Sequence, residues 1–272
     1  MREPLSIEPV MVPIPAGSFL MGTPGEQMQL MEARFGWFRD GKVILPRNDT
    51  RRGPVSLSDE QPASVITLPA FQISRFLVTN AQMDVYYRET RRWAPWRWYD
   101  AGSPPEMADH PASEVPWKEA QAYAGWLREK TGQPYRLPTE AEWEKAARGD
   151  DGRLWPWGNG WDSTRANGRE SGLRTTTPVG HFSPRGDSPY GCADMVGNVW
   201  EWCASAYGPY PYPCDGSREE TDAGATRVAR GGSFSDDPYR LRCAWRSSYK
   251  PVPPYFPYIG FRVALASDTS PT

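Results

Sequence analysis

The stretch RLPTEAEWEKAARG, residues 136–149, contains a complete signal for the start of a helix. Thr139 can accept a hydrogen bond from the backbone of Glu142, and the Glu142 carboxylate can accept one in return. This capping box predicts a helix that begins at Thr139. Two further helices are predicted, one from the N-cap residue Thr79 and one from Trp117, where apolar residues recur at helical spacing.

Outside these helices the chain is typical of short strands and ordered turns. The 29 Pro and 25 Gly favour loops, while the 13 Trp, 13 Tyr and 9 Phe supply a core and argue against disorder. The pattern of residues 11–23 predicts two short strands around a turn, and we expect residues 24–62 to form an insertion. We expect one domain over residues 8–266, with a lead at 1–7 and a tail at 267–272.

Charge and hydropathy exclude several partners. The formal net charge is -2, and no cluster of Lys and Arg marks a nucleic-acid surface. No segment has the length of a membrane-spanning helix, so we expect no membrane insertion. The start of the chain, Met1 to Leu5, lacks the apolar core of a signal peptide, which predicts a cytoplasmic or virion-associated location.

The four cysteines match no zinc-binding or CxxC spacing. This predicts buried free thiols, with one or two disulfides as the alternative. The four are Cys192, Cys203, Cys214 and Cys243.

Residues 230–264, RGGSFSDDPYRLRCAWRSSYKPVPPYFPYIGFRVA, contain an unusual run of Ser, Asp, Tyr, Trp, Phe and Pro without helical or strand periodicity. This is the mixture that antibody paratopes use, since Tyr and Trp give contact area and Ser and Asp give adaptable hydrogen bonds. It predicts an exposed binding surface; the alternative is an aromatic loop folded onto the core. The predicted ligand-binding residues are Ser235, Asp236, Asp237, Tyr239, Trp245, Ser247, Ser248, Tyr249, Tyr255, Phe256 and Tyr258.

Six motifs occur in the order found in formylglycine-generating-enzyme-like, or sulfatase-modifying-factor, domains. They are MVPIPAGSFLMGT (11–23), RLPTEAEWEKAARG (136–149), WPWGN (155–159), DMVGNVWEW (194–202), RGGSF (230–234) and IGFRVA (259–264). The chain resembles this family over residues 8–266. The resemblance implies an α+β, C-type-lectin-like fold of the formylglycine-generating-enzyme type with low regular secondary structure.

The resemblance carries expectations about catalysis. In catalytic members, two cysteines soon after Gly-Gly-Ser bind copper, and copper(I) needs soft thiolate ligands. Residues 234–239 contain no cysteine, so we expect no copper and no enzyme activity. The alternative is an enzyme of the family, either a formylglycine-generating oxidase or a non-copper relative that uses Ser233 and Trp200, which line the site of catalytic members. The thiohistidine sulfoxide synthases of the family use a histidine-rich iron site, whereas this chain has only His110 and His181.

Variable proteins of diversity-generating retroelements share the fold and carry their variable region between RGGS-like and IGFR-like frames. Residues 230–264 resemble such a region. The function expected from this resemblance is binding of an unknown protein or surface ligand by diversified residues.

The resemblance also implies one calcium site. Asp194, Gly197, Val199 and Glu201 match a family pattern in which two side-chain oxygens and two carbonyls bind Ca²⁺, a cation that prefers oxygen ligands. The alternative is that Asp194 and Glu201 cap turns and pair with arginine.

Overall fold

The computed structural model describes residues 7–35, 38–39, 42–43, 57–92, 102–219, 224–250 and 258–266. Tyr255 and Phe256, two of the predicted ligand-binding residues, lie outside this part of the chain, as do the N-terminal lead apart from Ile7 and the C-terminal tail.

All three predicted helix starts are confirmed. Helix α2 (Asn80–Thr90) follows Thr79, whose side chain accepts a hydrogen bond from Gln82 in a capping box. Helix α3 begins at Trp117 and continues to Thr131, and helix α4 (Glu140–Arg148) follows the predicted capping box of Thr139 and Glu142. A helix that the sequence did not predict, α1 (Gly25–Phe35), lies within the expected insertion.

Short strands and 3₁₀ turns make up the remaining regular structure of the described residues. The strands are β1 (Met11–Ile14), β2 (Gly17–Met21), β3 (Phe38–Arg39), β4 (Lys42–Val43), β5 (Ser64–Leu68), β6 (Phe71–Ser74), β7 (Trp200–Ala206), β8 (Arg227–Arg230), β9 (Arg246–Tyr249), β10 (Ile259–Gly260) and β11 (Ala264–Ala266). The 3₁₀ helices are η1 (Leu57–Glu60), η3 (Pro105–Met107) and η4 (Arg169–Ser171).

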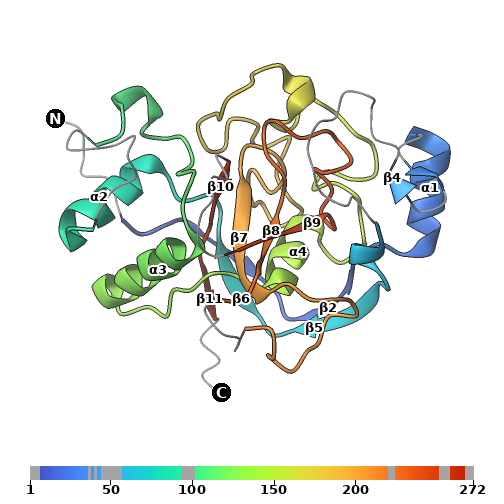
Figure 1. The fold of residues 1–272 in the computed structure, drawn as a ribbon, viewed down its shortest axis with the longest axis horizontal. Coiled ribbons are helices and arrows are strands. Elements are labelled where there is room, and N and C mark those ends of the chain that lie inside the picture. Colours follow the sequence, from blue (N-terminus) through green and yellow to red (C-terminus); the bar gives the residue numbers. More distant parts are fainter. Residues whose placement is uncertain are drawn as a thin grey trace.

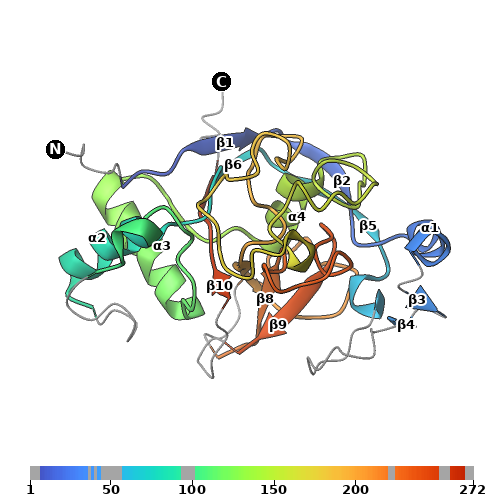
Figure 2. The ribbon, with the colours of Figure 1, turned by 90° about the horizontal axis from the view of Figure 1, so that it is seen from above.

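The strands form two small sheets and two strand pairs. One sheet has the order β1-β6-β11 and the other β10-β7-β8-β9, while β2 pairs with β5 and β3 with β4. Helices α2 and α3 lie together at one end of the molecule and α1 at the other (Figure 1). Seen from above, α4 lies between the β1–β6 layer and the β8–β9 layer (Figure 2).

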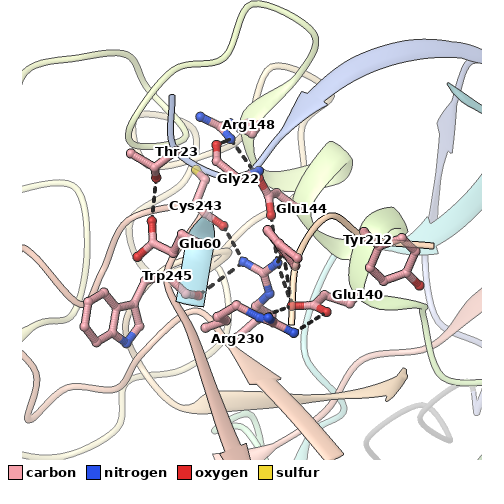
Figure 3. Close-up of polar contacts among 12 residues, drawn as sticks. Gly22, Thr23, Glu60, Glu140, Glu144, Arg148, Tyr212, Arg230, Cys243 and Trp245 are labelled. Atoms are coloured by element: carbon pink, nitrogen blue, oxygen red, sulfur yellow. Dashed lines mark hydrogen bonds and ion pairs between the residues drawn. The ribbon is translucent and has the colours of Figure 1, made fainter. Parts of the chain in front are cut away.

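Helix α4 brings buried charges into the centre of the molecule. Glu140 and Glu144, one helical turn apart, both contact the Arg230 guanidinium, at 2.9 and 2.7 Å, and none of the three side chains is exposed (Figure 3). Arg246 also contacts Glu140, at 2.7 Å. Arg242 contacts Glu60 at 2.6 Å. Since Arg230 and Arg246 flank residues 231–245, these ion pairs hold both ends of that segment.

Within the described residues, no helix combines the length and the apolar character needed to cross a membrane.

Candidate functional site

Three buried side chains, Trp200, Ser233 and Asp236, form a hydrogen-bonded group that we call the Asp236 cluster. One carboxylate oxygen of Asp236, Oδ2, accepts hydrogen bonds from the Ser233 backbone N–H at 2.9 Å, the Ser233 hydroxyl at 2.7 Å and the Trp200 indole Nε1 at 3.0 Å. Burial strengthens such bonds because water does not compete for the donors. The cluster therefore holds an oriented carboxylate against a hydroxyl group.

The backbone around Gly232 brings Ser233 next to Asp236. Gly232 has a φ of +71°, and a Cβ at this position would lie 2.6 Å from the Leu241 side chain. A larger residue would be both strained and in collision. The RGGS motif thus allows the chain to leave β8 in a tight turn, after which Asp236 N donates to the Ser233 carbonyl at 3.0 Å.

Positive charge and aromatic rings lie next to the cluster. The second oxygen of Asp236, Oδ1, is 3.8 Å from the Arg240 guanidinium. The Tyr249 ring meets the Trp200 ring edge-on at a centroid distance of 6.2 Å, and burial raises the pKa of Tyr249 above its ordinary value. The Phe234 and Tyr258 rings are 4.4 Å apart. These contacts place a cation and aromatic side chains beside the cluster.

Arg169 supports the outer side of the segment that contains Asp236. Its backbone N–H donates to the Asp236 carbonyl at 2.9 Å, and its guanidinium donates to the Ser235 carbonyl at 3.1 Å and lies 3.3 Å from the Asp237 carboxylate. Neither Arg169 nor Arg240 was predicted as a site residue. The signal in the sequence is the adjacent pair Asp236 and Asp237, which requires cations nearby.

The prediction that the variable residues are displayed on the surface is wrong for three of them. Asp236, Tyr239 and Trp245 are only 3%, 3% and 6% exposed, because they pack in the cluster and in the core. Of the rest in the described part, Tyr258 is 38% exposed. The half-buried ones are Ser235, Asp237, Ser247, Ser248 and Tyr249. In its described residues, 230–250 and 258–264, the segment is therefore largely an interior element with a partly exposed rim.

Of the four residues predicted to bind calcium, the two with carboxylates already accept hydrogen bonds from protein groups. Glu201 accepts hydrogen bonds from Arg262 at 2.6 and 2.8 Å and from the Trp143 indole at 2.9 Å, so its charge is already compensated. Asp194 accepts from the Gly180 N–H at 2.6 Å, and burial raises its pKa to about 6. Gly197 and Val199 are buried backbone positions beside them. The resemblance implies calcium binding here, whereas the arginine partner of Glu201 disfavours it, and a melting experiment with and without calcium distinguishes the two.

Thiol chemistry is disfavoured in this structure. All four cysteines are free thiols in the structure, and only Cys214 is exposed. Burial raises the pKa of Cys192 to about 11 and that of Cys243 to about 12, and it raises the pKa of Cys203 well above its ordinary value. These thiols are protonated near neutral pH, whereas copper(I) prefers thiolates. In the described residues, no three His, Cys, Asp or Glu side chains group as metal ligands do.

Comparison with known proteins identifies the family. The model of the sulfatase-modifying factor enzyme 1-like domain matches residues 2–267. The chain is 35% identical to hercynine oxygenase of Mycolicibacterium smegmatis over 242 residues, which cover 75% of this chain and 55% of that protein. It is 30% identical to the formylglycine-generating enzyme of Bos taurus over 326 residues, covering 96% of this chain and 75% of the relative. The chain thus spans only about half the length of the hercynine oxygenases it matches.

Solved structures confirm the fold. PvdO from Pseudomonas aeruginosa has a TM-score of 0.71 and 30% identity, covering 96% of this chain and 95% of that one. Treponema denticola variable protein 1 has a TM-score of 0.66 at 22% identity, over 94% of each chain. The predicted C-type-lectin-like α+β fold is therefore correct. The likeness to the variable protein shows the fold alone, so the assignment as a retroelement variable protein is not confirmed.

The prediction that the chain is not an enzyme is contradicted by these relatives. Hercynine oxygenase and the formylglycine-generating enzymes of Bos taurus and Thermomonospora curvata are enzymes, and they match most of the chain at 30 to 35% identity. The missing cysteines after Gly-Gly-Ser argue against one chemistry of the family and not against catalysis in general. The chain belongs to the sulfatase-modifying factor enzyme 1-like family.

Proposed function

We propose that this chain is an enzyme of the sulfatase-modifying factor family that works without a pair of copper-binding thiolates, with its catalytic centre at the Asp236 cluster. The observation that carries this proposal is the 2.7 Å hydrogen bond from the Ser233 hydroxyl to the buried Asp236 carboxylate. The family resemblance implies that Trp200 and Ser233 are positions that line the site of catalytic members. Asp236 stands in the segment where those members carry their cysteines.

The cluster has the parts needed for proton transfer. Asp236 can accept the proton of Ser233 and act as a general base, because its carboxylate already accepts a hydrogen bond from the Ser233 hydroxyl. The Ser233 hydroxyl also lies 3.1 Å from that of the half-buried Ser235. The path Asp236, Ser233, Ser235 thus connects a buried base to the edge of the site.

The rim residues fit a substrate-binding role. Tyr258 is exposed and packs on Phe234, and the half-buried Tyr249 packs on Trp200. In this proposal the partly exposed residues of the 230–264 segment contact the substrate. The names of two relatives, hercynine oxygenase and formylglycine-generating enzyme, favour oxidative modification as the reaction class.

The proposal can be tested by oxygen uptake. The purified chain, supplied with iron(II) or copper(I), is assayed against hercynine, free cysteine and a Cys-x-Pro-x-Arg peptide. We expect turnover that does not depend on copper, and for the compound turned over we expect Asp236→Asn to lower kcat/KM by about 100-fold or more, the loss typical of a missing general base. The surface variant Asp162→Asn is the control and should leave turnover unchanged.

Two results would overturn the proposal. Conversion of the peptide cysteine to an aldehyde with copper would show the copper reaction that we exclude. Full activity of a folded Asp236→Asn variant, verified by an unchanged near-UV circular-dichroism spectrum, would move the catalytic centre elsewhere.

A further inference from the structure

A groove of about 500 Å³ lies between helix α3, the segment just before α4 and the middle of β7. It is lined from α3 by residues on one side of the helix, from β7 by Ala204, and from the following loop by Gly216 and Glu219. None of its lining residues belongs to the Asp236 cluster or to its rim. The volume is within the range of about 300 to 1,000 Å³ that is typical of small-molecule sites.

Small residues line the middle of the groove. Gly125 lies in the middle of α3, where glycine costs about 1 kcal/mol relative to alanine. A Cβ at Gly125 would meet no atom within 4 Å, so no close contact in the described structure requires glycine there. Ala124 beside it and Ala204 opposite are also small. The missing side chain of Gly125 therefore leaves open space in the groove, and no neighbouring element of the described residues packs into that space.

The floor of the groove is apolar. Trp117 and Leu137 are buried side chains that line it. The Arg227 guanidinium stacks on the Trp117 ring at 4.1 Å, and the Trp117 indole donates to the Cys203 carbonyl at 2.9 Å, which together fix the ring. A fixed aromatic floor offers an apolar ligand surface at little entropic cost.

Two other charged side chains of the groove already have hydrogen-bond partners. Glu219 accepts hydrogen bonds from the Ser205 and Tyr212 hydroxyls, at 2.5 and 2.7 Å. Arg136 makes two parallel bonds to the Glu142 carboxylate, at 2.7 and 2.6 Å.

Arg128 differs from these residues. It is exposed, lies about one helical turn from Gly125, and forms no ion pair with another residue in the part of the chain that the structure describes. Gln121 occupies the corresponding place on the other side of Gly125 and is also exposed. The groove thus has an apolar centre with an available cation and an amide at its rim.

We propose that this groove binds a small amphipathic carboxylate, with the apolar body over Gly125 and the carboxylate on Arg128. Guanidinium groups bind carboxylates through charge-assisted hydrogen bonds, and since Arg136 is paired with Glu142, Arg128 is the cation of the groove that remains available to an anion. This site is additional to the proposed catalytic centre and does not depend on it.

The test uses phenylbutyrate and the uncharged phenylbutanamide as probes for the full chain, with ligand-observed NMR and isothermal titration calorimetry. A ligand of this size is expected to bind with a Kd of about 2 mM. We expect Arg128→Gln to raise the Kd of phenylbutyrate about fivefold or more. The unsubstituted protein should bind phenylbutanamide with a Kd that is higher by a similar factor. Gly125→Leu, which fills the groove, should abolish binding.

Matched controls are available on the same chain. Lys118→Gln removes an exposed cation of α3 that does not line the groove, and Gly25→Leu adds a side chain in open space on α1. Both should leave Kd unchanged. Equal binding of acid and amide, or unchanged binding by folded Arg128→Gln or Gly125→Leu, would overturn the proposal. Absence of saturable binding would also overturn it. A concentration-dependent dimer that Gly125→Leu dissociates would do the same, since the groove would then be an interface between copies.

Discussion

The guanidinium of Arg262 lies 2.6 and 2.8 Å from the two carboxylate oxygens of Glu201, and neither side chain is exposed. The indole of Trp143, on α4, donates to the same carboxylate at 2.9 Å. The pair joins β7, the IGFRVA segment and the central helix. It also compensates the negative charge that a calcium ion at Glu201 would need.

The first prediction concerns calcium. We expect millimolar Ca²⁺ to leave the melting temperature unchanged relative to EDTA, because Arg262 already compensates Glu201. A true site would raise stability by about 2.7 kcal/mol at a calcium concentration of 100 times Kd. Differential scanning calorimetry measures the difference, and a calcium-dependent rise that disappears in Asp194→Asn would restore the site implied by the family resemblance.

The second prediction is a stability gain at alkaline pH in Asp194→Asn. Burial raises the pKa of Asp194 to about 6, so the folded state retains a proton that the unfolded chain, with an ordinary Asp pKa of about 4, has released. The stability that the protein has with Asp194 protonated is fully present below about pH 4 and is lost as pH rises towards 6. Asn carries no charge, tolerates the φ of 55° at this position, and keeps an oxygen for the Gly180 N–H.

We therefore expect Asp194→Asn to stabilise the protein at pH 8 by up to about 3 kcal/mol and to be near neutral at pH 4. Urea unfolding in EDTA at the two pH values checks this, with substitution of an exposed aspartate, Asp109→Asn, as the control. Loss of stability at pH 8 in Asp194→Asn would mean that the ionised carboxylate has a partner.

A third prediction concerns Glu140, which contacts both Arg230 and Arg246 in the interior. Glu140→Gln should lower the free energy of unfolding by about 3 to 5 kcal/mol, since two buried guanidinium groups lose an anionic partner. The exposed ion pair of Glu89 with Lys130, at 2.6 Å, is the comparison, and Glu89→Gln should change stability little. Similar effects of the two substitutions in chemical denaturation would contradict the buried network.

The fourth prediction separates interior from rim in the 230–264 segment. Trp245, only 6% exposed, packs edge-on against Tyr239 at 5.8 Å, so Trp245→Ala should cost about 3 to 5 kcal/mol. Ser248 is half-buried on β9, and Ser248→Ala should stay within about 0.5 kcal/mol. Thermal unfolding compares the two variants. A tolerated Trp245→Ala would return the whole segment to the displayed surface first expected.

The helix starts could be predicted because their determinants are local. The capping boxes at Thr79 and Thr139 each involve residues three positions apart, and the apolar stripe of α3 repeats within one helix. The location of Asp236 could not be predicted in this way. An Asp in a Ser- and Asp-rich run favours exposure, yet Asp236 is buried because the Trp200 indole, 36 residues earlier, donates to it.

The sequence alone determined the family, the α+β fold and the three helix starts, since ordered motifs and capping residues depend on neighbours along the chain. Only the tertiary structure decided which charges are compensated and which remain available. Glu201 and Arg262 are 61 residues apart, and Glu140 and Arg246 are 106 apart. Whether a carboxylate binds an arginine, a hydroxyl or a metal depends on groups that packing brings within about 3 Å, and no local pattern in the chain specifies that distance.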